Sequence, residues 1–168
     1  DSFEDGVGAL LDNLSPPARL VVRLLAAARQ PLPRAVVAGI RMGGARLTTI
    51  AIEEAIASGL VIVIDDRLSI VHELHAEAVE AVELPGERVR LHATLASVFE
   101  ERPSRAAWHW AAAGRTREAF TAHRAAAAIA RASDPGETAL HHDLRALGFW
   151  ATLEASGDGN AHAEDTTD

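Results

Sequence analysis

The sequence predicts a mainly α-helical protein, in which a winged-helix domain of three helices and a β-hairpin precedes antiparallel helical hairpins of tetratricopeptide-like type. Two observations predict this fold class. Apolar residues recur at helical spacing through most of the chain, and one short β-branched run with a return strand interrupts them. Helix, helix, helix, hairpin is also the order of elements in a winged-helix domain.

The first domain has clear helix signals. Ser15 and Pro16 are typical of an N-cap and a first helical residue, and the apolar pattern then predicts a helix over about 16–29. Prolines end it, and a short second helix leads to a glycine turn at 42–44. A third helix is expected over about 45–58, ending at Gly59 and carrying on one face Leu47, Ile50, Ala51 and Ala55.

The β-hairpin follows directly. Its first strand is the run LVIVI at 60–64, Asp65 and Asp66 supply the turn, and Leu68–Val71 is the return strand. The remaining pattern is helical, and the expected helices cover about 73–83, 87–100, 103–114, 116–132 and 136–155.

These elements divide the chain into four parts. Residues 1–14 are an N-terminal helix or linker, 15–83 the winged-helix domain, 84–156 the helical region and 157–168 a disordered tail. An offset of 34 residues, the period of tetratricopeptide helix pairs, separates the pattern Trp-x-x-Ala-Gly at 110–114 from Leu-x-x-Leu-Gly at 144–148. We therefore expect a helical pair with an open face that further repeats would cover.

Composition limits the function. The formal net charge of −8 works against general affinity for nucleic acid or anionic lipid, and the absence of cysteine excludes disulfides. The sequence has neither a run of roughly 18 apolar residues nor a secretory leader, so we expect a cytoplasmic protein with no membrane partner. Because the chain begins at Asp1 without methionine, we expect a segment of a longer protein.

His72 is the principal candidate site residue, because it stands where the hairpin ends and a helical pattern begins. The residues leave two interpretations open. A histidine beside the amides of a helix N-terminus can meet a phosphate oxygen, or it can simply hydrogen-bond the backbone and end the hairpin. Glu73 and Glu77 favour the second interpretation, because they place negative charge in the first turn.

The third helix occupies the position that enters the major groove in winged-helix DNA-binding proteins. A structural role is favoured, because two carboxylates face one guanidinium, with only Arg41 nearby. Its outward residues are expected to be Arg46, Thr48, Thr49, Glu53 and Glu54.

Two other groups allow a binding interpretation. Trp108, His109 and Trp110 could form an aromatic platform, but we expect the tryptophans to pack on different sides of a helix with His109 at the rim. His72 and His75 are three residues apart, but no third ligand follows them at a suitable spacing for zinc. A zinc site that adds the more distant His92 is an alternative, and it predicts a metal-dependent hydrolase. The adjacent His141 and His142 do not have the spacing of a helical chelate.

The sequence contains no P-loop, nucleophile elbow, paired-carboxylate motif or dinucleotide fingerprint. It therefore predicts neither catalysis, nor a metal, nor a cofactor bound by this chain alone.

The run VHELHAEAVEAVELPGERVRLHATLASVFEERPSRAAWHWAAAGRTREAF, at 71–120, carries a family resemblance. It resembles the segment that follows the nucleotide-binding core in large ATP-binding LuxR-type regulators and other STAND ATPases. The matching features are a strand ending in His72, an LP-x-E-R motif at 84–88, Arg90-Leu91-His92 where the family has R-x-x-LH, and A-x-HW-x-x-AG at 107–114, where this chain has AWHWAAAG. The order of elements is similar over roughly 15–150.

This resemblance implies a non-catalytic regulatory segment of a bacterial transcriptional regulator. Val71-His72-Glu73 is similar to the M-H-D motif whose histidine touches the β-phosphate of ADP in the closed state, so His72 would be an ADP sensor in the full-length protein. The implied partners are the nucleotide-binding domain of the same chain and a protein or small-molecule inducer on the helical repeats, with homo-oligomer formation open. The alternative is a stand-alone winged-helix DNA-binding protein with a helical dimerisation tail.

Overall fold

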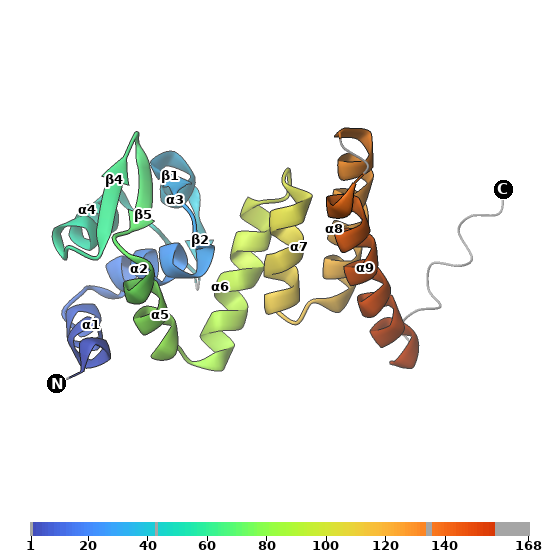
Figure 1. Cartoon of the computed structure of the whole chain (residues 1–168). Helices are drawn as coiled ribbons and strands as arrows, with labels where there is room; N and C mark the ends of the chain where they lie inside the picture. The colour runs from blue at the N-terminus through green and yellow to red at the C-terminus, as the bar shows by residue number, and fades with distance from the viewer. Residues whose placement is uncertain (1, 43, 134–135, 157–168) are drawn as a thin grey trace. The chain divides into compact units, whose positions relative to one another are not determined.

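The computed structural model describes residues 2–42, 44–133 and 136–156, so the predicted disordered tail at 157–168 lies outside the described residues. The described chain is mainly helical and contains a small three-stranded antiparallel sheet (Figure 1). It forms two compact units whose boundary falls between Thr94 and Leu95, within helix α6 (Pro85–Val98). We call them the N-terminal unit and the C-terminal unit.

The N-terminal unit contains five helices and five short strands besides the first part of α6, counted over its described residues. In chain order these are α1 (Phe3–Asp12), α2 (Pro16–Ala28), β1 (Leu32–Pro33), α3 (Arg34–Gly39), β2 (Arg41–Met42), β3 (Ala45–Arg46), α4 (Thr49–Ala57), β4 (Val61–Ile64), β5 (Arg67–Ile70) and α5 (Glu73–Ala81).

Helix α2 is the core of this unit. Ser15 caps it by accepting the Ala18 N–H, prolines occupy its first turn, and Arg29 ends it in the left-handed conformation at φ 52°. It packs against α4, α5 and β5, and its buried residues include Val21 and Leu24. Both are fully buried, which is the largest source of stability for a helix of this length.

The three-stranded sheet has the order β1-β5-β4. Strand β1 pairs with β5 so that Leu32 lies opposite Leu68, and both side chains are buried. The hairpin turn has positive φ at Asp65 (48°) and Asp66 (59°), the backbone of a two-residue type I′ turn. The sequence correctly predicts the hairpin but misses β1, because two residues that include a proline carry no strand pattern.

Replacing Asp66 by glycine is expected to stabilise the N-terminal unit by about 0.5–1 kcal/mol, because glycine adopts φ near 60° without a steric cost. The protection of the β4–β5 amides in hydrogen exchange measures this effect. Asp66→Ala is the matched control and is expected to give no gain; equal gains from both substitutions would contradict the turn assignment.

The third helix begins later than the sequence predicts. Residues 45–46 form β3, and the Thr48 hydroxyl then accepts the Ala51 N–H, so α4 starts at Thr49. Leu47 is buried ahead of the helix, whereas Ile50 is 79% exposed, so the prediction that these two residues share a buried helical face is wrong. The cap decides the boundary, and it changes which residues face inward.

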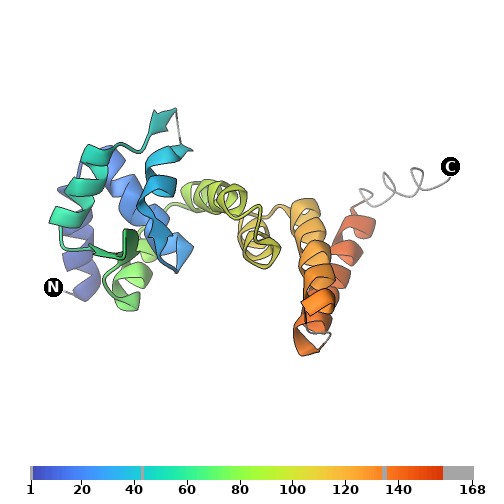
Figure 2. The ribbon, with the colours of Figure 1, turned by 90° about the horizontal axis from the view of Figure 1, so that it is seen from above.

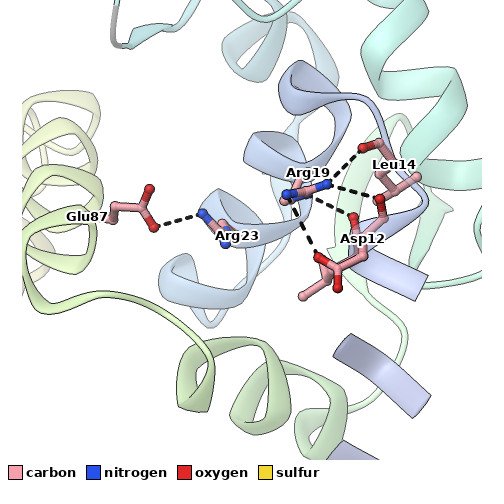
Figure 3. A network of polar contacts seen from close by, with 6 residues as sticks. Asp12, Leu14, Arg19, Arg23 and Glu87 are labelled. Carbon is pink, nitrogen blue, oxygen red and sulfur yellow. Dashed lines mark hydrogen bonds and ion pairs between the residues drawn. The ribbon is translucent and has the colours of Figure 1, made fainter. Parts of the chain in front are cut away.

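Arg19 fixes the connection between α1 and α2. Its guanidinium donates to the carbonyl oxygens of Leu11 (2.9 Å), Asp12 (3.1 Å) and Leu14 (3.2 Å), which lie at the end of α1 and in the turn that follows it (Figure 3). The segment expected to be an N-terminal helix or linker contains α1, and this helix packs against α5.

The C-terminal unit contains α7 (Pro103–Ala112), α8 (Thr116–Ser133) and α9 (Glu137–Ala155) besides the end of α6. Helix α8 packs between α7 and α9 and runs beside α9 in both views (Figures 1 and 2). Alanines at the contacts, such as Ala107, Ala119 and Ala127, are fully buried and let the helices approach closely.

The 34-residue repeat does not correspond to equivalent positions in this unit. Gly114 follows the end of α7 at φ 68°, whereas Gly148 lies in the interior of α9. The pattern match therefore joins a helix terminator to a mid-helix glycine. Of the helices in the described ranges, none is both long enough and apolar enough to cross a membrane.

Candidate functional site

His72 lies between β5 and α5 and is exposed. It is the N-cap of α5: its Nδ1 accepts the backbone N–H of Leu74 at 3.2 Å, and its carbonyl accepts the N–H groups of His75 and Ala76. The interpretation of His72 as a residue that hydrogen-bonds the backbone at the end of the hairpin is confirmed. Contact with a phosphate stays a prediction.

The cap also selects the tautomer of His72. A neutral imidazole has one accepting and one donating nitrogen. Because Nδ1 accepts from Leu74, Nε2 carries the proton and is a donor. The two interpretations of this residue are therefore compatible, since the nitrogen that caps the helix is not the one that would meet a phosphate oxygen.

A cavity of about 240 Å³ adjoins His72. Its polar lining comes from the end of α2, from β5 and from the start of α5, and consists of Arg29, Gln30, Ser69, His72 and Glu73. Whole small-molecule sites usually enclose 300–1,000 Å³, so this cavity suits a phosphate group and not a complete nucleotide.

Arg29 is held by acidic residues from α5. Its guanidinium makes a two-point contact with Glu80, at 2.8 and 2.9 Å, and a longer one with Glu73 at 3.4 Å. The hydrogen bond with Glu80 raises the pKa of Arg29 above its ordinary value. Because two carboxylates counter its charge, Arg29 positions α5 and does not make the cavity strongly positive.

Gln30 provides the strongest indication of a ligand. Its Nε2 is buried without a hydrogen-bond partner, which is costly for an amide donor. Gln30 and His72 both line the cavity, and each of their side chains carries an N–H donor. Glu73 also lines the cavity, and its carboxylate opposes the binding of an anion there.

The predicted zinc alternative has no assembled ligand set. His75 packs its ring edge-on to Phe3 at 4.9 Å, with its ring centroid 6.4 Å from that of His72. His92 is buried on α6. Within the described residues, no three histidine, cysteine or acidic side chains gather as a group that could hold a metal.

The residues that the sequence predicts to face outward on the third helix are exposed, with one difference. Arg46, Thr48, Thr49 and Glu53 are exposed, but Glu54 is half-buried. Its carboxylate accepts the N–H and the hydroxyl of Ser15, both at 2.6 Å, and therefore ties α4 to the start of α2. Glu53 pairs with Arg34, which leaves this face without a concentration of positive charge.

The aromatic triplet also differs in part from the prediction. His109 is buried and not at the rim, and it stacks on Phe99 with ring centroids 5.3 Å apart. Trp108 is 51% exposed, whereas Trp110 is half-buried. His109, expected at the rim, is therefore buried, and Trp108, expected to pack, is exposed, because the middle residue of the triplet faces inward.

The sequence misses a buried polar network in the C-terminal unit. Nε2 of His142 lies 3.1 Å from Oγ of Ser104, and its Nδ1 lies 2.9 Å from Nδ1 of His123. The network links α7, α9 and α8, and both histidines are buried. Burial lowers the pKa of His123 to about 4 and the pKa of His142 below its ordinary value.

Glu83, in the connection between α5 and α6, is the opposite case. Both of its carboxylate oxygens are buried without a hydrogen-bond partner, and burial raises its pKa to about 7. The nearby Arg23 is engaged with Glu87 at 2.8 Å (Figure 3). Arg23 and Arg88 both lower the pKa of Glu83, but the effect of burial is larger than theirs.

Comparison of the chain with protein-family models, curated proteins and solved structures finds no match.

Proposed function

We propose that this chain is a non-catalytic regulatory segment of an ATP-dependent LuxR-type (STAND) transcriptional regulator, in which a winged-helix domain couples nucleotide state to a helical sensor region. The observation that carries the proposal is the His72 corner, where His72, whose Nδ1 caps α5, and Gln30, whose Nε2 has no hydrogen-bond partner, line one cavity. The succession of three helices and a hairpin, with β1 completing the sheet, also supports a winged-helix assignment.

The proposed mechanism is a shift between two arrangements of the longer protein. Bound ADP supplies phosphate oxygens at the face that the nucleotide-binding domain presents. His72 and Gln30 donate hydrogen bonds there and stabilise the closed arrangement, while Arg29 keeps α5 in register through Glu80. An inducer that binds the helical region better in the open arrangement shifts the equilibrium the other way. The location is cytoplasmic, and homo-oligomer formation is compatible with this mechanism.

The test compares ADP release from the full-length regulator carrying His72→Ala or His72→Asp. Asp is a favoured N-cap but offers no donor, so it keeps the start of α5 and removes the proposed contact. Both variants are expected to release ADP at least about tenfold faster, because a hydrogen bond to a charged group contributes about 1.5–3 kcal/mol. Unchanged release from His72→Asp would show that His72 is only a cap.

The alternative, a stand-alone winged-helix DNA-binding protein, draws on the same order of elements. It is less well supported, because Glu53 pairs with Arg34 and Glu54 is tied to Ser15 on the helix that would read DNA. Titration of the chain with random duplex DNA at low salt separates the two functions. Micromolar binding with a steep salt dependence would favour the alternative.

A further inference from the structure

Helix α9 presents an exposed apolar stripe. Leu140, Leu144 and Leu147 are spaced four and three residues apart, which places them on one face of the helix. They are 58%, 60% and 62% exposed. Single exposed leucines are ordinary on protein surfaces, but three in succession along one helix form the kind of patch that marks a binding surface.

A groove between α8 and α9 adjoins this stripe. It encloses about 520 Å³, and its apolar lining comes from Phe120 on α8 and from Ala146, Leu147 and Trp150 on α9. Leu147 belongs to both the stripe and the groove, so the two form one continuous surface. The groove lies between two helices that pack against each other, and an amphipathic helix can place its apolar face in such a groove.

The charge of the groove is opposite to that of the chain. Arg124 and Arg131 line it against a single carboxylate, Asp143, although the whole chain carries 24 acidic and 16 basic residues. Asp143 pairs with Arg131, while Arg124 lies over the Phe120 ring at 5.9 Å. The two arginines are seven residues apart, a separation of roughly 10 Å along α8.

We propose that this surface, the α8–α9 groove with the Leu140, Leu144 and Leu147 stripe, binds an amphipathic helix of a partner protein with a leucine-type apolar face and an acidic flank. Acidic residues about seven positions apart on the partner meet Arg124 and Arg131, and its apolar face covers the stripe. A second copy of this surface is a poorer occupant, because two-fold pairing would bring the arginines of both grooves together. The proposal is independent of the role of His72.

The test titrates this chain with two labelled helical peptides of about 18 residues and follows fluorescence anisotropy. Both peptides carry leucine at positions 4, 8, 11 and 15. Beside this leucine face, one peptide has two glutamates seven positions apart, and the other has two lysines at the same positions. The glutamate peptide is expected to bind at least about tenfold more tightly, with an affinity that falls as salt is raised. Equal affinity for both peptides, or no binding of either, would contradict the proposal.

Matched variants locate the binding surface. Leu144→Ser and Arg124→Glu should each weaken the glutamate peptide about tenfold or more, and Arg124→Glu should favour the lysine peptide. Ile129→Ser is the control, because Ile129 is 55% exposed on α8 but does not line the groove. Loss of binding with the control, retention with Leu144→Ser, or self-association that Leu144→Ser abolishes would each overturn the assigned occupant.

Discussion

Acidification from pH 7.5 to 4.5 is expected to destabilise the C-terminal unit by about 2 kcal/mol, because His123 and His142 are buried in their neutral forms. The folded-state pKa of His123, about 4, lies below the ordinary value of 6.5, so the unfolded chain binds more protons between these limits. Stability is therefore full above pH 6.5 and falls as the pH drops toward 4.

The geometry of the network gives a second reason. One added proton can be accommodated if His142 donates to both Ser104 and His123, but a second would place two N–H groups against each other across the 2.9 Å contact. The charged groups that face His123 come from α9: His141, His142 and Arg145 all lower its pKa. None of these neighbours offsets the penalty of a buried imidazolium.

Tryptophan fluorescence measures this effect selectively, because all three tryptophans lie in the C-terminal unit. Urea unfolding at a series of pH values should show the decline in the wild-type chain. The double variant His123→Leu/His142→Leu should lose most of this decline, because it removes the two histidines whose folded-state pKa is lowered. His141→Gln, at an exposed neighbour, is the control and should keep most of the slope. A flat wild-type profile would contradict the network.

The N-terminal unit is expected to respond in the opposite direction. Glu83 has a folded-state pKa of about 7 against an ordinary 4.5, so the folded state binds more protons over this range. Its contribution to stability is full below pH 4.5 and is lost as the pH rises through 7. Glu83→Gln should therefore stabilise the unit at pH 8 by at most about 2 kcal/mol, because solvent screens part of the interaction, and have little effect at pH 4.5.

The N-terminal unit has no tryptophan, so its stability is measured by hydrogen exchange of the β4–β5 amides. Glu77→Gln is the matched control, because Glu77 is an exposed residue on α5 and should leave the pH profile unchanged. A Glu83→Gln variant that is no more stable than the wild type at pH 8 would contradict the prediction. It would mean that the Glu83 carboxylate is ionised and solvated at that pH.

Periodic patterns determine how much of this fold the sequence predicts. The helices from α5 to α9 begin and end within a few residues of their predicted bounds, because each has a regular apolar face and proline or glycine at its ends. Strand β1 escapes prediction, because its pairing of Leu32 with Leu68 is a tertiary contact that the two residues Leu32–Pro33 do not signal.

The candidate sites divide in the same way. His72 is predictable because a change of pattern places it at a corner. Ser104, His123 and His142 are not, because 19 and 38 residues separate the members of each pair and only the packing of three helices brings them together. Neither sequence pattern nor spacing indicates which of Trp108 and His109 faces inward.

The tautomer of His72 tests the central claim most directly. Long-range ¹H–¹⁵N NMR correlations of this chain at pH 8, where an ordinary imidazole is neutral, distinguish a protonated Nε2 from a protonated Nδ1. The proposed function requires the Nε2–H form, with Nδ1 accepting the Leu74 amide and Nε2 able to donate to a phosphate. A protonated Nδ1 would leave only an acceptor at Nε2 and would contradict the role of His72 as a phosphate sensor.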